Sequence, residues 1–225
     1  MKKNQLIINT FFTIICCILL QKSLFAEPAN LGVLRSEVQA YHDSGAYQRE
    51  LDQIISKAQH YIIRQAKNNA HSTHPKKLAI VLDIDETSLS NYKRMAARQF
   101  VANREQLFQE VLAADAPAIK PMLSLYSHAL KQGVAIFFVT GRREAGREAT
   151  IKNLKSAGYH DWSGLYLRPI NYKLTSIIPL KTQARAEIRK QGYTIIADIG
   201  DQYSDLKGAN AEKSFKLPNP YYYIP

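Results

Sequence analysis

Three stretches of the chain are continuously apolar, and each of them ends in polar residues. They cover residues 77–83, 133–141 and 192–201, and shorter apolar stretches occur at 165–167 and 214–217. Strands of a parallel sheet are covered by helices on both faces, so they lack the polar–apolar alternation of half-exposed strands. These stretches therefore predict the strands of a buried parallel sheet.

Helical patterns separate the predicted strands. Apolar residues recur at three- and four-residue steps through 34–70, where Ser44-Gly45 is a candidate break between two helices and Asn68-Asn69 marks the end. Further helical stretches are expected at 121–132, 143–157 and 179–191. Alternating strands and helices predict an α/β fold of three layers, with a central parallel sheet and an N-terminal helical segment.

One interval is too long for a simple strand-to-helix loop. It covers roughly residues 88–118, between the first strand and the next core helix, and residues 103–114 within it have a helical pattern. We expect this interval to form a small helical cap inserted beside the end of the first strand.

Residues 1–26 have the order of a secretory signal peptide. Lys2-Lys3 is followed by the apolar stretch 6–20 and, after a polar turn, by Ala26. An apolar stretch of about 15 residues is short for a membrane span, which needs roughly 20. We expect cleavage after Ala26, a periplasmic or secreted domain over 27–225, and no stable membrane anchor. An uncleaved anchor is the alternative, because Leu24 is a poor residue for the −3 position.

Composition adds two exclusions. Cleavage would remove Cys16 and Cys17, the two cysteines of the chain, and with them any disulfide, cysteine nucleophile or cysteine-bound metal. The chain has 30 basic and 19 acidic residues, a net charge of +11. Three of the basic residues lie in 1–26, which leaves +8 afterwards. The positive charges are spread along the chain, which argues against a nucleic-acid polymer as partner and favours attraction of small anionic substrates.

The polar ends of the predicted strands are the candidate site, because ligands of open α/β sheets bind at the carboxyl ends of the strands. The first strand ends at Asp83 and Asp85, the second at Thr140-Gly141, and the third at Asp201, with Asp205 shortly after it. Carboxylates so close repel one another unless a cation lies between them. Oxygen ligands without nearby cysteine or histidine suit Mg²⁺.

Two further groups indicate that the site also holds an anion. The hydroxyl of Thr140, with adjacent backbone N–H groups, and the ammonium of Lys181 would together bind a phosphate. Lys173 is the alternative to Lys181. A metal ion, a nucleophilic carboxylate and a phosphate clamp point to phosphoryl transfer.

These residues, in order, resemble the four motifs of the haloacid dehalogenase (HAD) superfamily. The finer resemblance is to its subfamily IIIB secreted acid phosphatases, the class B and class C bacterial enzymes and the plant vegetative storage proteins. The residues that carry it are Asp83 to Tyr92, Val139 to Arg142, Lys181 to Arg185 with Gln191 to Tyr193, Gly200 to Asp205, and the ending Lys216 to Tyr223. The resemblance covers roughly residues 30–225 and implies a Rossmann-like HAD fold. The choice between class B and class C stays open.

The resemblance also implies catalytic roles. Asp83 would be the nucleophile that takes the phosphoryl group as an aspartyl phosphate. Asp85 would protonate the leaving alcohol and then activate water against that intermediate. Thr140, Gly141 and Lys181 would bind the phosphoryl oxygens.

The same resemblance implies the metal ligands. Mg²⁺ would be held by Asp83, the backbone carbonyl of Asp85 and Asp201. Asp205 would act as a ligand through water or as a neighbour that supports the ligands.

Other residues have less specific interpretations. Tyr92 and Phe100, in the cap, are candidates to stack on a base or an aromatic leaving group. Arg142 and Arg143 are candidates to touch the substrate, but the favoured expectation places them on a solvated helix start. Asp198 inside the last long strand is expected to be structural. The spacing of His71 and His74 resembles a metal motif, but a polar loop without further ligands argues against zinc.

The sequence thus predicts a secreted Mg²⁺-dependent acid phosphatase that hydrolyses nucleotides or small organic phosphates. Two alternatives stay open: a non-catalytic storage or binding protein on the same scaffold, and a receiver-like phosphoacceptor domain. The leader and Asp85 argue against the receiver. The aromatic tail 221–223 is expected to pack within the chain or to form a contact in a homo-oligomer.

Overall fold

A computed structural model describes residues 27–225 of the chain. The predicted leader, 1–26, lies outside the described residues. A boundary after Glu37 divides the chain, and the second unit, Val38–Pro225, is compact and contains the sheet. None of the helices in the described part is long and apolar enough to cross a membrane.

The second unit alternates strands and helices. The strands are β1 (Lys77–Leu82), β2 (Ala135–Arg143), β3 (Gly164–Arg168), β4 (Tyr193–Gly200) and β5 (Ser214–Lys216). The helices of the described chain are α2 (Leu31–Asp43), α3 (Ala46–Ala70), α4 (Tyr92–Ala97), α5 (Arg104–Ala113), α6 (Lys120–Lys131), the 3₁₀ turn η2 (Glu144–Gly146), α7 (Arg147–Ser156), α8 (Ile178–Lys190) and α9 (Tyr203–Leu206).

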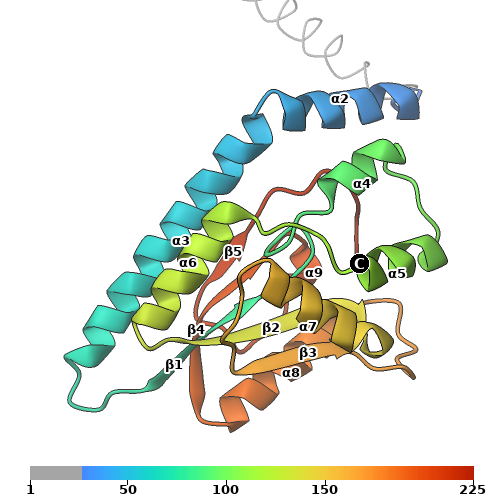
Figure 1. The fold of residues 1–225 in the computed structure, drawn as a ribbon. Helices are drawn as coiled ribbons and strands as arrows, with labels where there is room; N and C mark the ends of the chain where they lie inside the picture. Colours follow the sequence, from blue (N-terminus) through green and yellow to red (C-terminus); the bar gives the residue numbers. More distant parts are fainter. Residues whose placement is uncertain (1–26) are drawn as a thin grey trace, which may run out of the picture. The chain divides into compact units, whose positions relative to one another are not determined.

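The five strands form one parallel sheet in the order β3-β2-β1-β4-β5 (Figure 1). β1 lies at the centre, and its last residue, Leu82, pairs with Phe138 of β2 and Ile199 of β4. All carboxyl ends therefore meet at one edge of the sheet. This arrangement confirms the predicted α/β fold with a central parallel sheet.

The apolar stretches lack alternation because both faces of the sheet are covered. Ile80 and Leu82 of β1 pack in the core beneath α3, α6 and α7, whereas Ala79 and Val81 pack against α8 on the opposite face. In Figure 1, α3 and α6 lie side by side on one face of the sheet and α8 lies on the other. Successive side chains of a strand point to opposite faces, so a strand buried on both needs apolar residues throughout.

Most predicted elements occur within a few residues of their expected positions. The break near Ser44-Gly45 is confirmed, because Gly45 adopts the left-handed conformation, with φ of +75°, between α2 and α3. The helices α4 and α9 were not predicted. Both are short, and four to six residues carry too few apolar positions to show a helical period.

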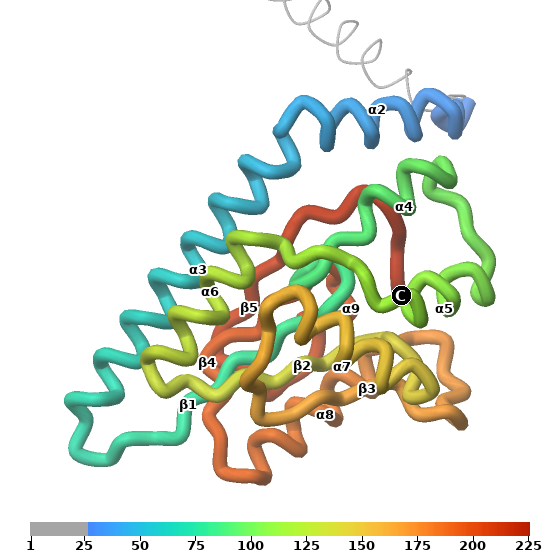
Figure 2. The backbone as a smooth tube through the Cα atoms, in the orientation of Figure 1, coloured from blue at the N-terminus to red at the C-terminus, as the bar shows by residue number. Residues whose placement is uncertain are grey.

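The interval between β1 and α6 contains α4 and α5. Two ion pairs join these helices and the segment that follows them, Arg98 with Glu110 and Arg94 with Asp115. The C-terminal tail passes next to the same interval (Figure 2), where the ring of Tyr221 stacks on that of Phe100, with centroids 5.8 Å apart. The tail also reaches the segment after β1, where the hydroxyl of Tyr222 donates to Glu86 at 3.2 Å.

Candidate active site

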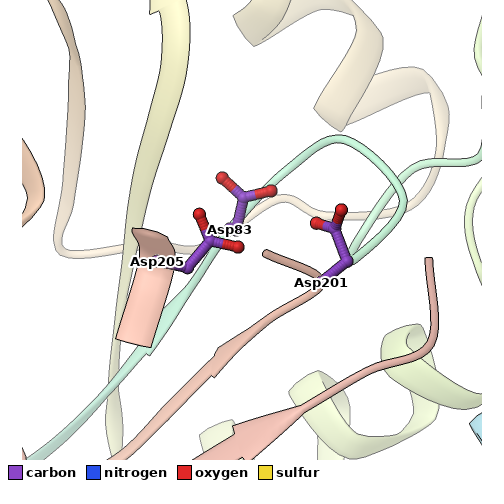
Figure 3. A group of neighbouring side chains, drawn as sticks. All are labelled: Asp83, Asp201 and Asp205. Carbon is purple, nitrogen blue, oxygen red and sulfur yellow. The ribbon is translucent and has the colours of Figure 1, made fainter. Parts of the chain in front are cut away.

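Three buried aspartates meet at the carboxyl edge of the sheet. Asp83 follows β1, Asp201 follows β4, and Asp205 lies in α9. Each offers a carboxylate oxygen within 4.8 Å of the others, and the three carboxylates face a common space in Figure 3. Among the described residues, this is the one group of acidic, histidine or cysteine side chains with such spacing, and the exposed His71 and His74 form no part of it.

Lys181 partly compensates these charges. It is buried in the first turn of α8, and its Nζ donates to Oδ1 of Asp83 at 2.5 Å and to Oδ1 of Asp205 at 2.6 Å. Burial favours the neutral amine, but the charges of Asp205 and Asp83 outweigh it and raise the pKa of Lys181 above its ordinary value. Lys173, by contrast, is exposed.

One ammonium cannot neutralise three carboxylates. Burial raises the pKa of Asp83 well above its ordinary value, and the charges of Asp205, Asp201 and Asp85 add to the rise, although Lys181 opposes it. A buried group of oxygen donors with uncompensated negative charge is the donor set of a hard divalent cation. The residues present therefore fit a metal ion of this class.

Asp201 is held by four side-chain donors. Thr87 Oγ1 donates to its Oδ1 at 2.9 Å. Its Oδ2 accepts from Asn219 Nδ2 at 2.6 Å, Gln202 Nε2 at 3.1 Å and the hydroxyl of Tyr222 at 3.3 Å. The orientation of this carboxylate is therefore set by residues from β1's end, α9's start and the C-terminal tail.

Asp205 is positioned by its own helix end. Its Oδ2 accepts the backbone N–H of Gln202 at 2.8 Å, which completes a capping box at the start of α9. Gly200 makes room for this turn, because a Cβ at that position would collide with the Asp205 carboxylate. The glycine before Asp201 is thus a steric requirement of the site.

Asp85 faces a different partner. Arg142 donates to it through Nη2 at 2.8 Å and through Nε at 3.0 Å, and Asn91 Nδ2 donates at 2.9 Å. Burial opposes ionisation of Asp85, but the guanidinium of Arg142 prevails and holds the pKa of Asp85 below its ordinary value. The expectation that Arg142 lies on a solvated helix start is wrong: its side chain is 3% exposed, because β2 continues through Arg143.

Thr140 and Gly141 lie on β2 beside the end of β1. Leu82 of β1 pairs with Phe138 of β2. Asp83 comes one residue after this pair on its strand, and Thr140 comes two residues after it. Thr140 is buried, and its Oγ1 accepts the backbone N–H of Arg142 at 3.1 Å. The structure thus brings Thr140 to the edge that carries Asp83.

Glu86 is a buried acid that the sequence interpretation did not single out. It has φ of +55°, and its carboxylate accepts the backbone N–H of Asn91 at 2.5 Å and the hydroxyl of Tyr222 at 3.2 Å. Burial, together with the charges of Asp85 and Asp201, raises the pKa of Glu86 to about 8. Tyr222 is far from Glu86 in the sequence, and Asn91 lies in an irregular turn, so no periodic pattern of the sequence indicates that Glu86 is buried.

Tyr92 and Phe100 belong to an aromatic cluster of the chain itself. Tyr92 stacks on the ring of His42, and its hydroxyl donates to Asp43 at 2.8 Å. Tyr221 contacts both rings, and its buried hydroxyl has no hydrogen-bond partner among the described residues. The expected packing of the aromatic tail is therefore confirmed for Tyr221.

Asp198 is structural, as expected. Its Oδ2 accepts from Arg185 Nη1 at 2.8 Å, and both side chains are almost fully buried. The same guanidinium donates to the carbonyl oxygens of Asp205, Lys207 and Ala209. Arg185 therefore ties α8 to α9 and to the loop that follows it.

Comparison with known proteins gives matches along most of the chain. The family model described as HAD superfamily, subfamily IIIB (Acid phosphatase), matches residues 27–225. Acid phosphatase 1 of Solanum lycopersicum is 35% identical over 191 residues, which are 83% of this chain and 73% of the relative. Stem 28 kDa glycoprotein of Glycine max is 40% identical over 157 residues, which are 67% of this chain but only 61% of that relative.

Solved structures share the fold. The class C acid phosphatase from Bacillus anthracis superposes with a TM-score of 0.69 over 86% of each chain, at 22% sequence identity. This likeness confirms the predicted HAD-type architecture, and the family model confirms the predicted subfamily and, with it, the enzyme class of the family, the phosphoric monoester hydrolases.

Proposed function

Because the chain belongs to subfamily IIIB of the HAD superfamily, the acid phosphatases, we propose that it hydrolyses phosphomonoesters through an aspartyl phosphate on Asp83. One observation carries the proposal: Asp83 is buried at the edge where β1, β2 and β4 end, within hydrogen-bond distance of Lys181 and close to two further acids. A carboxylate with a purely structural role would not need a buried lysine and two further buried acids around it.

The metal site is proposed for Mg²⁺. Asp83, Asp201 and the backbone carbonyl of Asp85 would hold it, and Asp205 would bind through water or support the other ligands. When bound, the ion supplies positive charge that offsets the carboxylates and the phosphoryl oxygens. Residues Thr87, Asn219 and Tyr222 keep the Asp201 carboxylate in place for this purpose.

In the first step, an oxygen of Asp83 forms a bond to phosphorus while the bond from phosphorus to the ester oxygen breaks. Asp85 gives its proton to that leaving oxygen, so an alcohol departs. Lys181, Thr140 and the backbone N–H of Gly141 bind the phosphoryl oxygens and stabilise their charge.

In the second step, Asp85 takes a proton from water as the water oxygen bonds to phosphorus. The bond between phosphorus and Asp83 breaks, which releases inorganic phosphate and restores both carboxyl groups. Arg142 favours the ionised form of Asp85, which suits this step, whereas mildly acid pH favours the protonated form that the first step needs.

The substrates are proposed to be nucleotides or small organic phosphates. The segment 88–118, with Tyr92 and Phe100, would form the cap over the leaving group. Residues 1–26 would act as a leader cleaved after Ala26, so that the enzyme works in the periplasm or outside the cell. The mass of the exported protein tests the cleavage position.

Hydrolysis of p-nitrophenyl phosphate tests the reaction. We expect activity with Mg²⁺, loss of activity with EDTA, and turnover reduced to the buffer background in Asp83→Asn. The matched control is Asp161→Asn, which makes the same change at an exposed position and should keep wild-type activity. Undiminished turnover in Asp83→Asn would contradict the proposal.

Two other experimental outcomes would favour the alternative functions, a storage or binding protein and a receiver-like domain. No turnover of any phosphomonoester, with Mg²⁺ still bound in calorimetry, would favour the storage or binding protein. A stable phosphoryl group on Asp83 after incubation with acetyl phosphate would favour the receiver-like domain.

A further inference from the structure

Three arginines beside the site have no role in the proposed reaction. Arg143 is the last residue of β2, Arg168 is the last residue of β3, and Arg104 is the first residue of α5. Arg143 and Arg168 are direct partners in the register of the two strands. The guanidinium of Arg143 also lies over the ring of Phe108 of α5, 5.5 Å from its centroid.

Arg168 lies close enough to the other two arginines for their charges to act on it. Partial burial, together with the charges of Arg143 and Arg104, lowers the pKa of Arg168 below its ordinary value. Like charges held this close repel, and the repulsion is stronger where water is partly excluded. An anion bound beside Arg168 and Arg143, which are register partners, would relieve this repulsion.

No acid of the described chain supplies that anion. Within residues 27–225, Arg104, Arg143 and Arg168 form no ion pair and donate no side-chain hydrogen bond. The arginines that do pair with an acid are Arg94, Arg98, Arg142, Arg147 and Arg185. The neighbouring acid Glu144 already pairs with Arg147. Five donors on each free guanidinium therefore remain for a ligand from solution.

The position of the three arginines relates them to the reacting phosphate. In the sheet order, β3 follows β2, which follows β1, and all three strands end at the same edge. With neighbouring strands about 4.8 Å apart, Arg168 lies about 10 Å along this edge from the strand that carries Asp83. Arg143 lies between them, three residues beyond Thr140.

We propose that Arg104, Arg143 and Arg168 bind a second phosphate of the substrate, and that the preferred substrates are bisphosphates with the two groups at opposite ends of a sugar. This inference rests on the proposed function. Two adjacent phosphates of a diphosphate lie too close together to occupy both places. Phosphate is the expected ligand because guanidinium groups bind its oxygens in pairs.

The first test compares substrates that differ by one phosphate. Adenosine 3′,5′-bisphosphate is compared with AMP, and fructose 1,6-bisphosphate with fructose 6-phosphate, by kcat/KM at constant ionic strength. We expect the wild-type chain to favour each bisphosphate by about tenfold or more, because charge-assisted hydrogen bonds contribute that much to binding. Equal kcat/KM values within each pair, in an enzyme that hydrolyses p-nitrophenyl phosphate, would overturn the inference and leave the proposed function intact.

The second test removes two of the three arginines, those that are partners in the register of β2 and β3. In the double variant R143Q/R168Q, the preference for bisphosphates should fall about tenfold, while kcat/KM for AMP changes less than about twofold. The matched control is K57Q/K67Q, which removes the same charge from exposed positions of α3 and should keep the preference. A similar loss in this control would show that net charge, and not the three arginines, attracts the substrate.

The third test does not depend on turnover. Binding of adenosine 3′,5′-bisphosphate to Asp83→Asn, with Mg²⁺ present, is measured by calorimetry with and without R143Q/R168Q. We expect about tenfold weaker binding in the combined variant. Equal affinities would contradict the arginine site even if the proposed phosphatase activity were absent.

Discussion

The acid pocket, by which we mean Asp83, Asp201, Asp205 and Lys181, and the α4–α5 segment differ in how far their charges are buried. In the pocket, Asp83 and Lys181 form an ion pair whose side chains are 9% and 4% exposed. In the α4–α5 segment, Arg94 and Asp115 form a pair whose side chains are 29% and 62% exposed. A buried pair is costly to break, because it leaves an unpaired charge away from water, whereas an exposed pair contributes little.

This difference in burial means that the groups proposed for catalysis and the segment proposed to select the substrate are held by different kinds of contact. The groups proposed for catalysis are fixed by strand ends and by buried partners, so a change in one of them disturbs the others. The segment proposed as the cap is held by pairs near the surface and by aromatic contacts. It can therefore change its sequence while the acid pocket stays intact.

After the complete loss of turnover expected for Asp83→Asn, the largest effect is expected for Asp85→Asn, because an amide cannot donate and accept the proton as a carboxyl group does. We expect kcat to fall by about 10²–10⁴-fold. The loss should be larger for an alkyl phosphate than for p-nitrophenyl phosphate, whose leaving group needs less protonation. Steady-state kinetics measures it, and a kcat within threefold of wild type for both substrates would remove Asp85 from the mechanism.

Breaking the buried ion pair of Arg185 and Asp198 should have an effect of nearly the same size, but on the stability of the fold. Arg185→Met leaves Asp198 buried without its partner, and burial already raises the pKa of Asp198 to about 7 with Arg185 present. We expect the free energy of unfolding to fall by about 3–5 kcal/mol. Urea denaturation measures it, with Arg98→Met as the matched change in a less buried pair.

An effect of similar size concerns the pH dependence of stability in the metal-free protein. The pKa of Glu86 is raised from 4.5 to about 8, so the folded state binds a proton that the unfolded state has lost. The stabilisation from this proton is complete below about pH 4.5 and is lost as pH rises to about 8, by up to about 1.4 kcal/mol per pH unit. Glu86→Gln mimics the protonated form and should flatten this slope.

Urea titrations in EDTA between pH 5 and pH 8 measure that slope. Wild type and Glu86→Gln should differ most at the alkaline end, where wild type has become less stable. Parallel curves over the whole interval would show that Glu86 is ionised throughout.

The smallest effect is expected in the α4–α5 segment. Glu110→Gln removes the charge that pairs with Arg98 at 3.1 Å, in a pair that is partly exposed. We expect the free energy of unfolding to change by less than about 1 kcal/mol. Thermal denaturation measures it, and a change as large as that in Arg185→Met would show that this segment is as rigid as the pocket.

The comparison of the two regions also explains what could be predicted from the sequence. Strand ends are local features, so Asp83, Asp201 and Thr140 could be assigned to one edge of a sheet before its strand order was known. The strand order itself depends on pairings between distant segments and was not predicted. Helix α4 was missed for a different reason, because it is shorter than two turns.

The partners of the acids could not be predicted in the same way. Arg142 reaches Asp85 from a neighbouring strand, and Asn219 and Tyr222 reach Asp201 from the tail. Each of these contacts is set by tertiary packing and leaves no periodic signal along the chain. The side chain of Arg142 was therefore predicted to be solvated, although the sequence shows an arginine directly after Gly141 of the candidate site.

The hydrogen bond from Thr87 to Asp201 joins residues that are 114 positions apart in the chain. Contacts of such long range form late in folding, because the loop between them must close first. Helices such as α3 can form earlier, from local contacts alone. During refolding, the recovery of helical circular dichroism should precede the recovery of metal binding, so a half-folded chain would already look ordered while it is still inert.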